Sequence, residues 1–167
     1  MTIDVRRATL DDLDIVAPLF NAYRMFYAQV SDVDAARAFL EQRLRADESM
    51  ILLATSDGRA AGFTQLYPMF SSVRLSRVWI LNDLFVAADA RRLGIASALL
   101  DAAQAMGREA GALRLELETT HDNHAAQTLY RGAGWTSHDE TLRFRNELPE
   151  GRLLYSTFPR RRESSDP

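Results

Sequence analysis

The spacing of hydrophobic positions changes several times along the chain, and each change predicts a new element. Residues 3–8 have the pattern of a short strand. From Thr9 onward apolar residues recur three or four positions apart, as on one face of a helix, and Thr9 and Asp12 fit a capping box at its start. A second helix is expected to begin at Ser31 or Asp32. Its apolar face would hold Ala36, Phe39, Leu40 and Leu44.

A hairpin and a buried strand follow these helices. Residues 49–56 and 59–68 are two apolar runs joined by Asp57 and Gly58, a pair typical of a tight hairpin turn. Residues 76–87, with the sequence SRVWILNDLFVA, are apolar and aromatic almost throughout. Such a run is typical of a strand that is buried on both faces. The first half of the chain therefore predicts a helical pair and three sheet strands after the initial strand.

The second half predicts a crossover. A helix is expected from about Ile95 to Ala110, ending near Gly111, and residues 112–118 alternate like a strand. Residues 122–135 fit a short capped helix. The runs 141–148 and 152–158 predict two last strands. This order, βααβββαβαββ, contains one β-α-β unit, so we expect an α/β fold with a mixed sheet and helices on both faces.

Length and composition predict one domain over residues 1–158. The chain has 167 residues, 47% of them hydrophobic, and its last segment, 159–167, is polar and charged and is expected to be a disordered tail. The beginning of the chain lacks a signal-peptide pattern, and no stretch is apolar enough to span a membrane. The default expectation is a cytoplasmic protein.

Charge and residue usage exclude several functions. The formal net charge of −3 does not favour binding to nucleic acid or to an anionic membrane, so a small partner is expected. All 20 basic residues are arginine, and there is no cysteine. Lysine Schiff bases, P-loop lysines, cysteine nucleophiles and thiolate metal sites are therefore excluded. His121, Asp122 and His124 lie close together in sequence, but they have no evident third and fourth ligands, and we expect no metal site.

The segment ARRLGIASALL, residues 90–100, has the features of an anion site. If a helix begins near Ile95, the amides of residues 92–97 lack helical partners, and Arg91 and Arg92 add positive charge. Gly94 and Ala96 keep bulky side chains out of the approach. An ordinary helix start explains the same residues about equally well. The partial match to a dinucleotide fingerprint also leaves a nicotinamide-dependent oxidoreductase as an alternative.

Two motifs at a fixed distance make the chain resemble a known family. Arg91, Gly94 and Ala96 occupy the three defined places of an R/Q-x-x-G-x-G/A loop. A second motif follows after the alternating strand, and its positions are filled by Asn123, Ala126, Leu129, Tyr130, Gly134 and Trp135. Together, over residues 78–136, they resemble the GNAT superfamily of acetyl-CoA-dependent N-acetyltransferases.

The resemblance implies a GNAT fold, with a mixed, mostly antiparallel central sheet whose fourth and fifth strands splay apart. The pantetheine arm of acetyl-CoA would bond to the open strand edge like a partial extra strand. The implied acetyl-CoA-binding residues are Leu84, Phe85 and Val86 on that strand, Arg91, Arg92, Leu93, Gly94, Ile95, Ala96 and Ser97 at the pyrophosphate, and Asn123 and Tyr130. For Asn123, capping of the last helix is an equal alternative.

The same resemblance implies direct attack of an amine on the thioester. Tyr130 matches the tyrosine that stands near the CoA sulfur, where it would protonate the leaving thiolate. The strand LNDLFV looks like that of diamine and histone-type members, but Asn82 stands where some polyamine members carry glutamate. Asp83 is therefore our first choice as base, with Glu116 and Glu118 as alternatives. Strict alternation would place Asn82 and Asp83 on opposite faces unless a bulge intervenes.

The acceptor half of the reaction is expected to be a small primary amine, polyamine-like or another amino compound. Its tentative binding residues are Tyr23, Tyr27, Asn82, Asp83 and Glu118. Aromatic and acidic side chains suit an ammonium group, although Tyr23 and Tyr27 also fit the core stripe of the first helix. The alternatives are a protein lysine or N-terminal acetyltransferase and a non-catalytic acyl-CoA-binding module. By analogy with the family we expect a homodimer.

Overall fold

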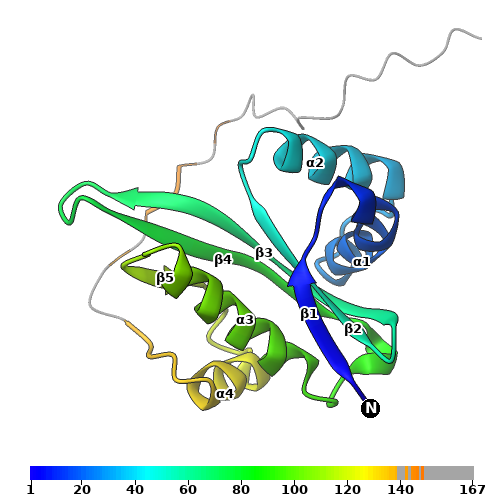
Figure 1. Cartoon of the computed structure of the whole chain (residues 1–167). Coiled ribbons are helices and arrows are strands. Elements are labelled where there is room, and N and C mark those ends of the chain that lie inside the picture. Colours follow the sequence, from blue (N-terminus) through cyan, green and yellow to red (C-terminus); the bar gives the residue numbers. More distant parts are fainter. Residues whose placement is uncertain (139–141, 143, 147, 149–167) are drawn as a thin grey trace, which may run out of the picture. The chain divides into compact units, whose positions relative to one another are not determined.

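The structure, a computed structural model, describes residues 1–138, 142, 144–146 and 148. Over these residues the expected order of elements is confirmed (Figure 1). The elements are β1 Ile3–Arg7, α1 Leu13–Phe26, α2 Val33–Arg45, β2 Met50–Ser56, β3 Arg59–Ser71, β4 Ser76–Val86, α3 Ile95–Glu109, β5 Arg114–Glu116 and α4 His124–Gly132. Short 3-10 turns cover Leu10–Asp12 and Ala88–Ala90. The strand β5 is shorter than the alternating run 112–118 suggested.

Contacts group residues Met1–Ser137 into one compact unit and His138–Pro167 into another. The expected strand at 152–158 and the tail at 159–167 lie outside the described residues, and so does part of the run at 141–148. The prediction of a single domain over residues 1–158 therefore stays a prediction. Everything below concerns the unit Met1–Ser137.

Side chains stabilise the predicted starts of both early helices. At the first, the Thr9 backbone N–H donates to the Asp12 carboxylate at 2.8 Å. Arg6 donates to the same carboxylate at 2.6 and 2.8 Å, and this hydrogen-bonded pair holds the pKa of Asp12 well below its usual value. At the second, the Asp32 side chain accepts from the Ala35 backbone N–H at 2.8 Å. These contacts satisfy amides that the helices leave unpaired.

The sheet has the order β1-β2-β3-β4-β5, antiparallel except for the parallel pair β4–β5. Alternate residues of β2 enter two different cores. Ile51 and Leu53 pack with α1 and α2, whereas Leu52 and Ala54 pack with α3. The helices therefore cover both faces of the sheet, as Figure 1 shows and as the sequence predicted. Residues of α4, among them Leu129 and Tyr130, pack on the α3 side.

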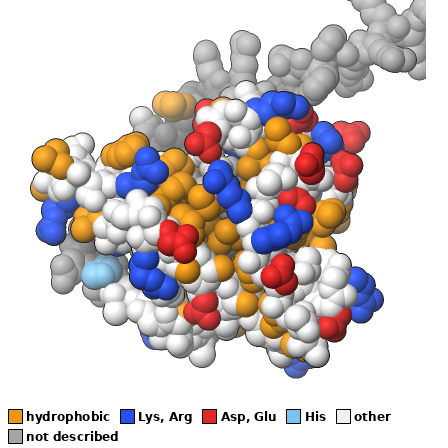
Figure 2. Space-filling model, in the orientation of Figure 1, with side chains coloured by type: hydrophobic (Ala, Val, Ile, Leu, Met, Phe, Trp, Pro, Cys, Tyr) orange, Lys and Arg blue, Asp and Glu red, His pale blue; other side chains and the backbone are white. Residues whose placement is uncertain are grey.

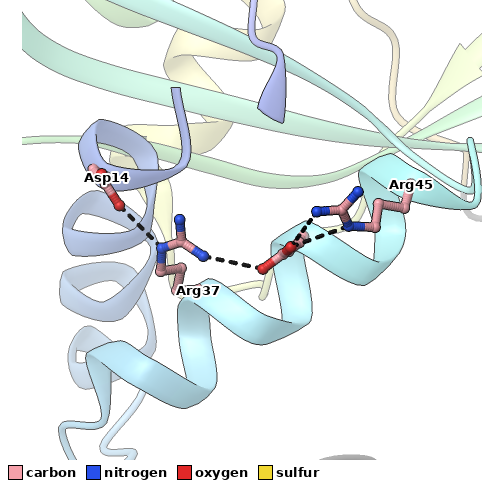
Figure 3. A network of polar contacts seen from close by, with 4 residues as sticks. Asp14, Arg37 and Arg45 are labelled. Atoms are coloured by element: carbon pink, nitrogen blue, oxygen red, sulfur yellow. Dashed lines mark hydrogen bonds and ion pairs between the residues drawn. The ribbon is translucent and has the colours of Figure 1, made fainter. Parts of the chain in front are cut away.

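Polar side chains connect the outer surfaces of α1 and α2 (Figure 3). Arg37 in α2 donates to Asp14 in α1 and to Glu41, both at 3.0 Å, and Arg45 donates to Glu41 at 2.7 Å. Exposed ion pairs of this kind add little stability individually. Over the face seen in Figure 2, arginine and acidic side chains are mixed, without a large patch of one sign.

Gly62 lets β3 approach the end of β4 closely. A Cβ at this position would lie 2.5 Å from the carbonyl oxygen of Phe85, which is backbone and cannot rotate away. We expect Gly62→Ala to lower the free energy of unfolding by about 1–3 kcal/mol, measured by urea denaturation. Gly132→Ala is the matched control, because a Cβ there meets nothing within 4 Å. Equal stabilities of the two variants would contradict this packing.

Candidate active site

The strands β4 and β5 separate after three residue pairs, as the family resemblance implied. Val78, Trp79 and Ile80 pair with Arg114–Glu116, while on its other edge β4 stays paired with β3 as far as Val86. Among the described strands, nothing pairs with the β5-facing edge of β4 beyond Ile80. The predicted residues Leu84, Phe85 and Val86 lie on this open stretch. Its backbone can accept an extended ligand that hydrogen bonds like a strand.

The predicted anion loop leads into α3 with the geometry of an open helix start. Gly94, the residue before the helix, has φ 85° and has no side chain that could cap the helix. The first helical hydrogen bond runs from the Ala98 N–H to the Gly94 carbonyl at 3.0 Å. The amides of Ile95, Ala96 and Ser97 therefore have no helical partner. The first turn carries no acidic residue to compete for them. Arg91 and Arg92 precede these amides in the chain and are exposed, so the loop suits a phosphate.

Two members of the predicted loop have further structural roles. The Ile95 side chain is 1% exposed and packs in the core, so only its backbone is available to a ligand. The Arg91 Nε–H donates to the Val86 carbonyl at 3.3 Å, which ties the loop to the end of β4. Arg92 has φ 61°, a backbone conformation that non-glycine residues rarely adopt. Such strain is common where a backbone is shaped for a ligand.

A β-bulge at Asn82 decides which way Asp83 faces. On β3 Leu66 pairs with Leu81 and Gln65 with Asp83, so Asn82 has no partner residue across the ladder. Leu81 and Leu84 consequently both pack on the α3 side, and Asp83 turns to the α1 side. Without the bulge, Asp83 would share the face of Leu81. The sequence left open that a bulge could change which face of the sheet Asp83 lies on, and the structure contains such a bulge.

Asp83 is a buried carboxylate, 5% exposed, held by neighbours from three elements. The Asn82 amide donates to it at 3.1 Å, and the Tyr23 hydroxyl of α1 also donates to it. Its backbone carbonyl accepts from the Thr64 hydroxyl at 2.7 Å. Burial raises the pKa of Asp83 to about 6, against the effect of the two donors. A carboxyl with this pKa is a stronger base than an exposed one.

Sequence reasoning missed a buried polar residue, Gln65, next to Asp83. Gln65 is fully buried and is the cross-strand partner of Asp83. Its amide donates to the Ser49 hydroxyl at 2.8 Å, while its Oε1 has no partner among the described residues. The signal was present in the sequence, because a glutamine in an apolar strand must be accommodated at some energetic cost.

Tyr23 and Tyr27 connect Asp83 with the surface. Their rings meet edge to face, with centroids 5.1 Å apart. Tyr23 also packs against Phe63 and Phe85, so its core role is confirmed together with its contact to Asp83. Burial, and then Asp83, raise the pKa of Tyr23 far above its usual value. Tyr27 is 57% exposed.

Tyr130 and Asn123 lie on the other side of the site, on α4 and at its start. The Tyr130 ring packs at 6.4 Å from Trp135 and is half-buried, and this burial, followed by the nearby Tyr27, raises the pKa of Tyr130. It therefore stays protonated at neutral pH, as an acid must. The Asn123 side chain accepts from the Ala126 N–H at 3.2 Å, so it caps α4.

A groove of about 480 Å³ joins the end of α1 to the loop before α4. Its lining residues are Phe26, Tyr27, Glu118, Thr119, Thr120, Asp122 and Asn123. Of the predicted site, Tyr27, Glu118 and Asn123 meet here, while Phe26, Thr119, Thr120 and Asp122 were missed. Their common signal is proximity in sequence to predicted site residues. A second hollow, about 410 Å³ on the outside of α2, contains none of the predicted site residues.

The remaining candidates are placed elsewhere or form no site. Glu116 accepts from Arg114 at 2.6 Å, which agrees with its alternative role on a charged sheet face. Among the described residues, no three histidine, aspartate or glutamate side chains gather in a way that could hold a metal ion. No helix in that part of the chain is both long and apolar enough to cross a membrane. The antiparallel strands β1–β4 also disagree with a dinucleotide-binding fold, whose strands run parallel.

Comparisons with known proteins agree with this geometry. The model of the acetyltransferase (GNAT) family matches residues 16–135. The uncharacterized N-acetyltransferase YhfO of Bacillus subtilis (strain 168) is 48% identical over 133 residues, which cover 80% of this chain and 89% of that protein. The crystal structure of a probable acetyltransferase has a TM-score of 0.84 and 45% identity, and the match covers 89% of this chain and 99% of that chain. An aminoglycoside N(6')-acetyltransferase type 1 of Klebsiella aerogenes is 28% identical over 112 residues, 66% of this chain and 74% of that protein.

Proposed function

The chain belongs to the acetyltransferase (GNAT) family and is an N-acetyltransferase, and we propose that it transfers acetyl from acetyl-CoA to a primary amine of a small, positively charged molecule. The proposal about the acceptor rests on the groove between α1 and the loop before α4. Its walls combine the carboxylates Glu118 and Asp122 with the rings of Phe26 and Tyr27. Carboxylates and aromatic faces both attract ammonium groups.

The size of the groove also favours a small acceptor. A volume of about 480 Å³ lies in the range of small-molecule sites. The aminoglycoside acetyltransferase among the relatives acts, by its name, on an amine-bearing small molecule, which supports the same class here. A polyamine-like acceptor is the finer form of the proposal. A protein lysine or N-terminal amine is the alternative within the enzyme class.

Acetyl-CoA would bind in the other half of the site. The open helix start from Arg91 to Ser97 would hold the pyrophosphate, and the free edge at Leu84, Phe85 and Val86 would hydrogen bond to the pantetheine arm. Tyr130 would meet the sulfur, and Asn123 would keep its capping bond while it lines the groove. The bound co-substrate supplies an activated acetyl thioester.

The chain's own residues would then move two protons. Asp83 is the proposed base that receives the proton of the acceptor ammonium, which frees the nitrogen lone pair for attack. Tyr130 is the proposed acid that donates its hydroxyl proton to the departing thiolate, and the proton that the amine nitrogen loses as the amide forms restores the phenol. Both roles agree with the directions of their pKa values, because a raised carboxyl pKa makes a better base and a raised phenol pKa keeps the proton on Tyr130.

A thiol-release assay with an amine panel tests the proposal. We expect release of CoA from acetyl-CoA with polyamines or amino sugars, at a higher kcat/KM than with lysine peptides or peptide N-termini. Faster reaction with the peptides would contradict a small acceptor. Thermal stabilisation by acetyl-CoA, without thiol release for any amine, would instead favour an acyl-CoA-binding module.

Removing the loop charges should weaken acetyl-CoA binding. For the double variant Arg91→Ala and Arg92→Ala we expect the KM for acetyl-CoA to rise about tenfold or more, since tenfold corresponds to about 1.4 kcal/mol. Arg74→Ala, in the turn between β3 and β4, is the matched control. The wild-type KM should also rise with salt, because exposed charges are screened. An unchanged KM in the double variant would exclude a role for these arginines in binding.

The cytoplasmic location and the homodimer expected from the sequence remain predictions. Gel filtration at several protein concentrations measures the second of them directly.

A further inference from the structure

A side chain of α4 holds the loop that forms one wall of the groove, residues 117–123. The amide Nε2 of Gln127 donates to the backbone carbonyls of Thr120 and His121, at 3.2 and 2.9 Å. These carbonyls belong to the two peptide groups directly before Asp122, which lines the groove. We infer, on the basis of the function proposed above, that Gln127 is a positioning residue that holds Asp122 where it binds an ammonium group of the acceptor.

The partners of the Gln127 amide fix its orientation. Backbone carbonyls can only accept hydrogen bonds, so the NH2 group must face the loop. The amide oxygen accepts from the Arg131 guanidinium, a group that can only donate, at 3.3 Å. Turning the amide over would therefore lose all three hydrogen bonds. Gln127 thus joins the loop to α4 in one orientation.

The backbone is bonded on both sides of Asp122. Its carbonyl accepts from the His124 N–H at 2.9 Å, and the Asn123 N–H donates to the Thr120 carbonyl at 3.2 Å. With the two bonds from Gln127, the loop is closed against the first turns of α4. The neighbouring Thr120 side chain holds the pKa of Asp122 below its usual value, so the group is a carboxylate at neutral pH. The arrangement presents a negative charge to the groove from a backbone held in place.

Stabilisation of α4 alone does not explain these contacts. The start of the helix already has a cap, because the Asn123 side chain accepts from the Ala126 N–H at 3.2 Å. Gln127 donates to carbonyls that precede the helix, so its bonds order the loop. Thr128 is the opposite case, since its hydroxyl donates to the His124 carbonyl inside the helix at 2.9 Å. Thr128 therefore provides the matched control.

The first part of the experiment removes the amide of Gln127. Gln127→Met keeps an unbranched side chain of similar length and loses both donors. We expect the KM for a linear diamine to rise about tenfold, because two hydrogen bonds no longer hold the loop. The kcat at saturating diamine and the Kd for acetyl-CoA should change by less than about twofold, and Thr128→Val should keep the wild-type KM. Thiol release measures kcat and KM, and calorimetric titration measures Kd.

A double-mutant cycle with Asp122→Asn separates positioning from general support of the fold. Asparagine keeps the shape of the side chain and lacks its charge. If Gln127 acts through the Asp122 carboxylate, each single variant raises the KM for the diamine about tenfold, and the double variant raises it little further. Independent effects would multiply to about 100-fold. Circular dichroism and thermal unfolding establish that each variant is folded.

Three results would overturn the inference. An unchanged KM in Gln127→Met would mean that the loop keeps Asp122 in place without this side chain. A wild-type KM in Asp122→Asn would remove the carboxylate that Gln127 positions, and independent effects in the cycle would mean that Gln127 acts elsewhere. All three leave the proposed acetyl transfer intact, because the wild type still acetylates the diamine. Absence of thiol release in the wild type with every amine would instead reject the proposed function, and this inference with it.

Discussion

Replacing Tyr130 with phenylalanine is expected to lower kcat by about 100-fold while it leaves the affinity for acetyl-CoA nearly unchanged. The variant loses only the hydroxyl, so the packing of the ring against Trp135 is kept. The leaving thiolate then has to take its proton from water, and the transition state loses a positioned donor. Steady-state kinetics with the preferred amine measure kcat, and calorimetric titration measures acetyl-CoA binding.

Two further measurements make the Tyr130 result specific. The loss in rate should be smaller for an acyl donor whose thiol leaving group is more acidic, because such a group needs less protonation. The thermal stability of the variant should stay close to that of the wild type. A kcat equal to that of the wild type would exclude Tyr130 as the acid.

Asp83→Asn is expected to inactivate the enzyme and to stabilise its fold. At pH 7 to 8 we expect kcat/KM to fall by about 100-fold, since an amide cannot take the ammonium proton. The rise in activity near pH 6 should disappear as well. The side chain keeps its shape, so acetyl-CoA affinity should change little.

The gain in stability follows from the raised pKa of Asp83. Folding shifts this pKa from 3.8 to about 6, so the folded wild type binds more protons than the unfolded chain between these values. Its stability therefore decreases as the pH rises through this window, by about 1.4 kcal/mol per unit of pKa shift. Above pH 6 the asparagine variant avoids this loss and should be more stable by up to about 3 kcal/mol. Below pH 4 the difference should vanish.

Urea denaturation of both proteins at pH 4 and pH 8 measures this difference. A variant that is less stable than the wild type at pH 8 would mean that the ionised carboxylate stabilises the fold. If Asp83→Asn lowers activity and raises stability, the carboxylate of Asp83 is needed for catalysis although its ionisation destabilises the folded protein.

Local patterns were enough to predict most of the elements. The capping interactions at Asp12, Asp32 and Asn123 depend on residues three positions away, and each forms as expected. The turn at Asp57 and Gly58 also has the positive φ angles that a tight hairpin needs. Short-range stereochemistry sets these features, and it can be recognised in a single sequence.

The features that arrange the site depend on contacts between distant segments. The bulge at Asn82 becomes visible only when β4 is paired with β3, so the sequence left the direction of Asp83 open. The link from Asp83 to Tyr23 joins residues on two elements far apart in the chain. The sequence left Tyr23 either as a tentative acceptor-binding residue or as a core residue; its ring packs in the core against Phe63 and Phe85 and it also lies beside Asp83. The early end of β5 likewise reflects where the two parallel strands diverge.

The proposal of a small, positively charged acceptor is tested most directly with two amines of equal length. The measurement is kcat/KM for a linear diamine and for the corresponding monoamine, by CoA release, with the acetylated product identified by mass spectrometry. Because Glu118 and Asp122 line the groove, we predict that the diamine reacts at least about tenfold better, a difference of about 1.4 kcal/mol. Equal values for both amines, or release of CoA only with lysine peptides, would contradict the account.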